Sequence, residues 1–76
     1  MREKHPFIVL SFRTTVAAME WEKRCMEMGI PGRLIPLPRE ISAGCGLAWR
    51  MRPEEWEQWS GRIDTSVYDK VSCVWQ

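Results

Sequence analysis

Apolar and polar positions follow two different periods along the chain, and these periods predict its elements. Residues 7–12 form a continuous apolar run (FIVLSF), which is typical of a short strand covered on both faces and therefore central in a sheet. Residues 15–28 change to the spacing of an amphipathic helix. Gly29 and Pro31 follow, and both residue types favour the end of a helix at this point.

Two shorter strands come next, joined by a loop over residues 38–46. The run over residues 33–37 contains Pro36, which cannot donate a backbone hydrogen bond, so this strand is predicted to lie at an edge of the sheet or to end there. Residues 47–51 alternate in character. One face of this third strand is therefore expected to carry Leu47, Trp49 and Met51.

A second helix and a fourth strand complete the pattern. Pro53 suits the first position of a helix, and the two glutamates after it lie where the helix dipole favours anions. Gly61 is expected to end this helix. The last strand is predicted from Val67 to Trp75, and its alternation places three apolar side chains on the core side, namely Val71, Cys73 and Trp75.

The order strand, helix, strand, strand, helix, strand predicts the fold class. It is that of a ferredoxin-like α+β sandwich (βαββαβ), with a four-stranded antiparallel sheet and two helices on one face. We expect a single domain over residues 1–76, in which residues 1–6 form a mobile N-terminal tail. In this arrangement the loop over residues 38–46 and the start of the first helix, near Thr14, share one end of the sheet.

Composition narrows the function classes. Hydrophobic residues make up 45% of the chain and charged residues 28%, which is ordinary for a soluble globular domain. The formal net charge of +1 argues against nucleic acid as a partner, because such binding needs clustered lysines and arginines. The chain has neither an apolar run long enough to span a bilayer nor a signal-peptide pattern, so we expect a cytoplasmic protein that does not bind membranes. Most of the five tryptophans are expected in the core, and the alternative is an exposed docking patch.

Three cysteines with no CxxC pair do not suggest a disulfide framework. A structural zinc site usually takes four Cys or His ligands, and the chain has one histidine, so no metal is expected. Cys25 and Cys73 fall on apolar faces, where cysteine commonly acts as a small buried hydrophobe. Cys45 is different, because it lies in the loop.

Cys45 stands between Gly44 and Gly46, which leave the backbone around it free of side chains. The positive end of the first helix would favour a sulfur anion here. No histidine or second cysteine accompanies Cys45 in the loop, which argues against a Cys–His hydrolase and a CxxC oxidoreductase. The remaining candidates for support of the anion are the amides of residues 43–46 and the side chains of Arg13, Thr14, Arg39 and Ser42.

A plainer interpretation stays open for the same residues. Cysteine can fill a tight turn that needs two permissive glycine positions, without any chemistry. Arg39 and Glu40 can likewise form an ordinary solvent-exposed ion pair, which contributes little.

The loop and its flanks resemble a family of small bacterial proteins described as selenium/sulfur carrier-like. The matching stretches are RLIPLPREISAGCGLA over residues 33–48, SFRTT over 11–15, MGIP over 28–31 and RPEE over 52–55. The resemblance covers roughly residues 7–68. It implies a cytoplasmic bacterial or archaeal protein in which Cys45 is the candidate carrier residue. A carrier in this sense holds a persulfide or selenosulfide, needs no other cofactor, and exchanges the atom with donor and acceptor proteins rather than turning over a substrate as an enzyme.

Two other function classes remain. A non-catalytic interaction or regulatory module is favoured by the excess of tryptophans and the edge-type second strand, and it leaves a homodimer open. Single-stranded RNA binding through sheet aromatics has Tyr68 as its only support. Sulfur and selenium are not distinguished by the sequence.

Overall fold

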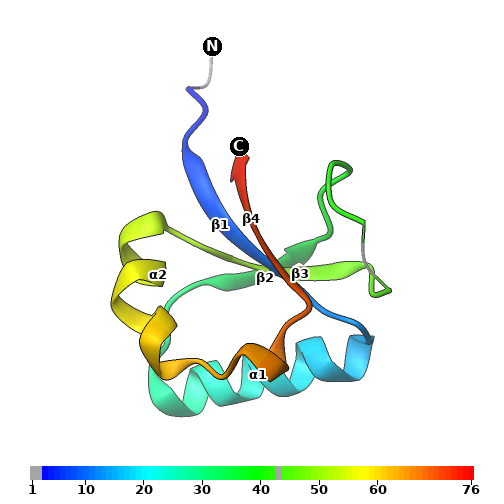
Figure 1. Ribbon diagram of the computed structural model, residues 1–76, viewed down its shortest axis with the longest axis vertical. Helices are drawn as coiled ribbons and strands as arrows, with labels where there is room; N and C mark the ends of the chain where they lie inside the picture. Colours follow the sequence, from blue (N-terminus) through cyan, green and yellow to red (C-terminus); the bar gives the residue numbers. More distant parts are fainter. Residues whose placement is uncertain (1–2, 43) are drawn as a thin grey trace.

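A four-stranded antiparallel sheet with the order β2-β3-β1-β4 forms the centre of the computed structural model, which describes residues 3–42 and 44–76 (Figure 1). Two α-helices pack on one face of this sheet, so the α+β, ferredoxin-like prediction is confirmed. The elements in chain order are β1 (Pro6–Ser11), α1 (Thr15–Met28), β2 (Arg33–Pro36), β3 (Leu47–Met51), α2 (Pro53–Trp59), η1 (Ser60–Arg62), η2 (Thr65–Val67) and β4 (Lys70–Trp75).

The continuous apolar run becomes the central strand β1, which pairs with β3 on one side and β4 on the other. Val9 and Leu10 are fully buried there, on opposite faces of the sheet. β2 lies at the edge, as Pro36 predicts. Pairing reaches into the segment expected to be a tail, because β1 begins at Pro6 and His5 exchanges two backbone hydrogen bonds with Gln76.

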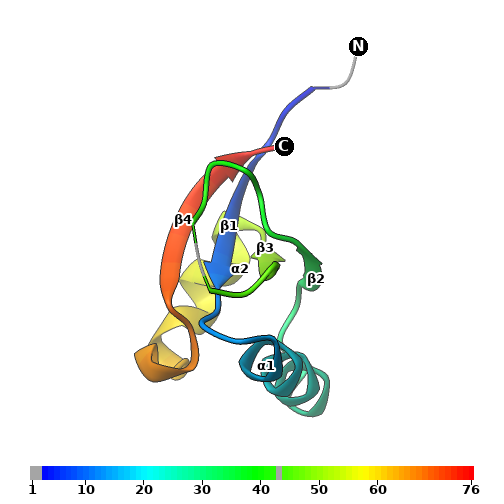
Figure 2. The ribbon, with the colours of Figure 1, turned by 90° about the vertical axis from the view of Figure 1, so that its right-hand side faces the viewer.

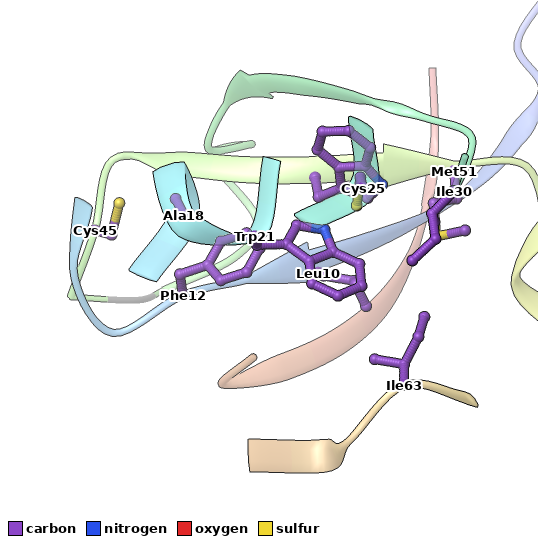
Figure 3. Packing of buried hydrophobic residues seen from close by; sticks show 10 residues of the cluster. Leu10, Phe12, Ala18, Trp21, Cys25, Ile30, Cys45, Met51 and Ile63 are labelled. Atoms are coloured by element: carbon purple, nitrogen blue, oxygen red, sulfur yellow. The ribbon is translucent and has the colours of Figure 1, made fainter. Parts of the chain in front are cut away.

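Helix α1 has the predicted beginning and end. The Oγ1 of Thr14 caps the helix by accepting from the backbone N–H of Ala17 at 3.1 Å. Gly29 adopts a left-handed conformation (φ 75°) that ends it. The buried face of the helix consists of Ala18, Trp21 and Cys25, and it packs on the sheet in the cluster shown in Figure 3.

The core has a second, smaller part on the other face of the sheet. Val9, Ala48 and Val74 form it from three different strands, and Ile41 of the β2–β3 connection covers them with 8% of its surface exposed. The connection, green in Figure 2, reaches back across the sheet toward β4. The loop is therefore folded onto the sheet at Ile41, four residues before Cys45.

The last strand differs from its prediction in where it begins and in the burial of Cys73. β4 begins at Lys70 rather than at Val67, and Cys73 is exposed rather than part of the core. The register pairs Cys73 with Ile8, which places it on the helix-covered face, but β4 is the outermost strand and Trp75 on the same face is 61% exposed. Val74, on the opposite face, is the buried residue of this strand because the loop reaches it.

The second helix and the tryptophans also differ in detail from expectation. α2 ends at Trp59, and the residues around Gly61 form a 3₁₀ turn instead of the helix end. Trp21 and Trp49 are buried, and Trp56 and Trp59 are half-buried. Trp75 is exposed.

Candidate functional site

Cys45 lies at the N-terminal end of α1. Its Sγ is 3.6 Å from the Oγ1 of Thr15, the first residue of the helix, and the thiol donates a hydrogen bond to that oxygen. The sequence places the loop and the start of the first helix at the same end of the sheet, and the structure confirms this proximity. A 14-residue helix presents a positive dipole end at this point, which favours an anionic sulfur.

A backbone amide also points at the sulfur. The N–H of Leu47 donates to Sγ at 3.3 Å. A hydrogen bond of this kind stabilises the charged form of its acceptor. The Thr15 hydroxyl accepts from the thiol and can rotate to donate to a sulfur anion. The Leu47 N–H can donate to either form, so both hydrogen bonds can persist when the thiol loses its proton.

The sulfur lies just beneath the surface. Cys45 is 3% exposed, while Gly44 and Gly46 on either side of it are exposed. Figure 3 places its side chain at one end of the helix-side cluster, beyond Ala18 and Phe12. Reaction with a partner therefore requires a local opening that uncovers Sγ.

The two glycines have different structural roles. A Cβ on Gly44 would lie 2.5 Å from the carbonyl oxygen of Arg13, so only glycine allows the loop to pack this closely against the segment before α1. Gly46 has open space around the same position, and its carbonyl accepts from the N–H of Leu37 at 2.9 Å, which closes the base of the loop. Gly44 thus serves packing within the molecule rather than space for a partner.

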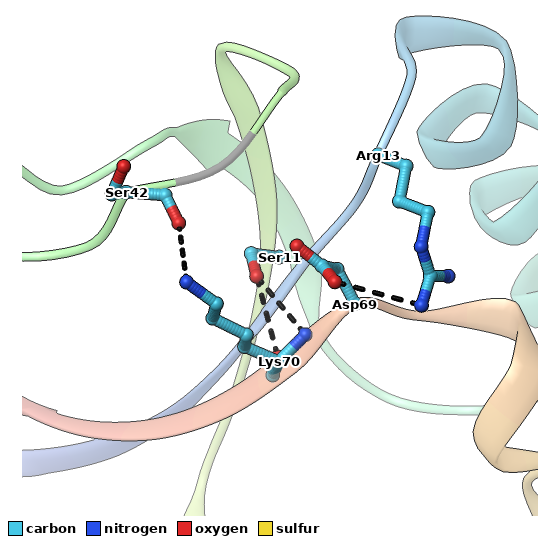
Figure 4. A network of polar contacts seen from close by, with 5 residues as sticks. All are labelled: Ser11, Arg13, Ser42, Asp69 and Lys70. Carbon is cyan, nitrogen blue, oxygen red and sulfur yellow. Dashed lines mark hydrogen bonds and ion pairs between the residues drawn. The ribbon is translucent and has the colours of Figure 1, made fainter.

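Arg13 and Thr14 lie at this end, but their side chains have other contacts. The Thr14 hydroxyl caps α1. The Arg13 guanidinium is 65% exposed and lies 3.6 Å from the carboxylate of Asp69, just before β4 (Figure 4). Its positive charge is near the start of the helix, partly balanced by this carboxylate.

Among the described residues, neither Ser42 nor Arg39 forms a hydrogen bond with the sulfur. The carbonyl oxygen of Ser42 accepts from the ammonium of Lys70 at 3.1 Å, which ties the loop to β4 (Figure 4). Arg39 is exposed, and the Arg39–Glu40 ion pair, which the sequence left open, is not formed in the described part of the chain, where Arg13–Asp69 is the ion pair. The amide of Ala43, another predicted donor, lies outside the described residues.

The two groups that form hydrogen bonds with Sγ, the Thr15 hydroxyl and the Leu47 amide, were not predicted from the sequence. Thr15 follows Thr14, near which the sequence places the start of the first helix, so the predicted proximity of helix and loop is the signal that could have found it. The N–H of Leu47 belongs to a residue assigned to a strand, and only the turn at Cys45 aims it at the sulfur.

The other two cysteines have different surroundings. Cys25 is buried, and that burial, with a further contribution from the Glu22 charge, raises the pKa of its thiol from 9.0 to about 12. This thiol stays protonated at neutral pH. Cys73 is exposed on the edge strand β4, and all three cysteines are free.

No group of three metal-ligating side chains comes together within residues 3–42 and 44–76. In the same part of the chain, neither helix has the length and apolar character needed to cross a membrane.

Comparison with known proteins gives one match. A family model described as "Putative Se/S carrier protein-like" matches residues 7–65, from β1 to the start of η2, and this span includes Cys45. Neither the curated proteins nor the solved structures give a match.

Proposed function

Because the chain belongs to the Se/S carrier protein-like family, we propose that it carries sulfur or selenium on Cys45 between a donor and an acceptor protein. The observation that carries this proposal is the position of Sγ, next to the first residue of α1 and within reach of the Leu47 amide. These groups favour an anionic sulfur, which is the form that attacks and the form that leaves in sulfur exchange.

The exchange needs no external oxidant. The Cys45 thiolate attacks the outer sulfur of a persulfide on the donor, a new S–S bond forms, and the donor cysteine leaves as a thiolate with the electron pair of the broken S–S bond. An acceptor thiolate then attacks the outer sulfur on Cys45, which leaves in the same way. With selenium the carried group is a selenosulfide, and the electrons balance identically.

The surroundings of Cys45 suit transfer better than hydrolysis. The single histidine of the chain, His5, pairs with Gln76 at the other end of β1 and so supplies no base to this site. Sulfur transfer needs no general base once the thiolate is formed, whereas a cysteine hydrolase does. A reducing compartment would keep the three free thiols available, and we therefore place the protein in the cytoplasm.

Mass spectrometry after sulfur loading tests the proposal. The protein is incubated with a cysteine desulfurase and its cysteine substrate, and we expect the mass of one or more sulfur atoms to be added at Cys45 and removed by a reductant. Cys45→Ala should lose this gain, while Cys73→Ala, which removes the exposed thiol, should keep it. Equal sulfur gain by Cys45→Ala and the parent would overturn the proposal.

A second candidate is a protein-interaction module without sulfur chemistry. It is favoured by β4, which is an edge strand with exposed apolar side chains at Val71 and Trp75. A second copy of the chain pairing along this edge would cover them. Sedimentation velocity distinguishes the two, because this candidate requires a dimer that Trp75→Ser weakens, and a strictly monomeric parent protein excludes that dimer.

A further inference from the structure

Three arginines line one open pocket at the end of the sheet away from Cys45. Arg33 is the first residue of β2, Arg50 is near the end of β3, and Arg52 follows β3, whereas Cys45 precedes β3. The pocket has a volume of about 390 Å³, and its other lining residues are Phe7, Gly32 and Glu55.

The sheet register brings two of these positive charges together. Arg33 and Arg50 are direct partners across β2 and β3, so their side chains leave the sheet on the same face. Arg50 also pairs with Val9, which belongs to the cluster on the face without helices. Like charges directly opposite one another are destabilising in a sheet, so the arrangement has a cost in the isolated molecule.

The partners of these arginines are mostly neutral. The Arg50 guanidinium lies 4.4 Å from the centre of the Phe7 ring, and its Nη1 donates to the Oε1 of Gln76 at 3.1 Å. The one carboxylate in the pocket, Glu55, accepts from the backbone N–H of Arg52 at 2.8 Å. Within the described residues the ion pair formed is Arg13–Asp69, so none of the three guanidinium groups is ion-paired.

We propose that this pocket is a docking site for an acidic segment of a partner protein, which supplies carboxylates to Arg33, Arg50 and Arg52. The planar guanidinium matches a carboxylate with two parallel hydrogen bonds, and such a ligand would remove the repulsion between the paired arginines. The site is separate from Cys45, and the inference does not depend on sulfur chemistry.

Charge and aromatic packing favour an acidic protein over RNA. The net charge of +1 and a patch of three arginines give little of the extended positive surface that a phosphate backbone requires. Base stacking needs free aromatic faces. Arg50 already covers one face of Phe7. The Tyr68 ring packs edge-on against Trp56, with 5.9 Å between the ring centres.

Peptide binding followed by NMR tests the site. The probe is an unlabelled hexaglutamate peptide. Hexaglutamine is the uncharged control peptide, and a single-stranded oligonucleotide tests whether phosphate groups bind instead. We expect hexaglutamate to shift the backbone amides of Arg33, Arg50 and Arg52, to bind more weakly as salt is raised, and to bind about tenfold more weakly to the double variant R33Q/R50Q. Arg62→Gln, an exposed arginine against Trp59, is the matched control and should bind as the parent does.

Each other outcome counts against the inference. Absence of hexaglutamate binding, equal binding of hexaglutamine, or equal weakening in Arg62→Gln would overturn it. Tighter binding of the oligonucleotide at the same amides would overturn the choice of an acidic protein. The single variant Arg33→Gln, at an exposed position, gives the same test if the double variant does not fold, with about a threefold loss expected.

Discussion

The sulfur of Cys45 lies 3.6 Å from the hydroxyl oxygen of Thr15, so the loop thiol and the first residue of α1 form one structural unit. This contact joins residues that are 30 positions apart in the chain. It gives the sulfur a hydrogen-bonding partner at the point where the helix dipole is positive.

Removing the Thr15 hydroxyl should slow reaction at Cys45. Thr15→Val keeps the shape of the side chain but loses the group that can donate to a sulfur anion, so alkylation of Cys45 at neutral pH is expected to slow about two- to tenfold, the range of a single hydrogen bond. The rate is measured by mass spectrometry with iodoacetamide. Thr15→Ser retains the hydroxyl and should react as the parent does; a Thr15→Val rate equal to the parent rate would show that the contact does not support the anion.

The two glycines beside Cys45 should respond differently to alanine. Gly44→Ala places a methyl group 2.5 Å from the Arg13 carbonyl oxygen, so it should lower the free energy of unfolding by about 1–3 kcal/mol. Gly46→Ala meets nothing within 4 Å and should change stability by less than about 0.5 kcal/mol. Urea unfolding of both variants checks the pair, and equal effects would contradict the packing described for Gly44.

Releasing the loop from β4 should make Cys45 easier to reach. Lys70→Met removes the hydrogen bond to the Ser42 carbonyl at an exposed position, so global stability should fall by less than about 1 kcal/mol, while alkylation of Cys45 in the folded protein becomes faster. Lys23→Met, an exposed lysine on α1, is the matched control. An unchanged alkylation rate in Lys70→Met would mean that this hydrogen bond does not limit access to the sulfur.

Alkaline pH should destabilise the protein through Cys25. Its folded-state pKa is raised to about 12 from 9.0, so the unfolded chain loses this proton first and unfolding is favoured as pH rises through that window. Below about pH 9 the contribution is fully present. Urea unfolding across the window should show a steeper loss of stability in the parent than in Cys25→Ala, which is less stable at neutral pH but lacks this titration. Parallel curves for the two proteins would show that the Cys25 thiol does not titrate as proposed.

The sequence predicts the elements where a residue type has a local physical effect. Pro36 removes a backbone donor, and β2 lies at the edge of the sheet as predicted. Gly29 permits a left-handed conformation, and α1 ends there as predicted. The burial of Cys25 follows from helical spacing in the same way. These are short-range effects, and they need no knowledge of the other strands.

The missed features depend on contacts between distant segments. Alternation places Cys73 on an apolar face, but its exposure depends on how far the helices extend over the outermost strand. Ile41 belongs to a loop, and its burial depends on Val9, Ala48 and Val74 coming together beneath it. For the candidate site, the sequence predicts the end of the sheet where Cys45 lies, but the Leu47 amide is aimed at the sulfur only by the folded turn.

Asp69, just before the last strand, and Lys70, its first residue, contact the two segments that meet at Cys45: Asp69 pairs with Arg13, and Lys70 donates to the Ser42 carbonyl. During synthesis the ribosome therefore delivers the thiol before it delivers the residues that secure its surroundings. Until these residues pair with β1, the growing chain lacks the two contacts that tie Arg13 and Ser42 to the sheet. The order of the residues along the chain thus makes the thiol an early product of synthesis, and the contacts that fasten its flanking segments form later, together with β4.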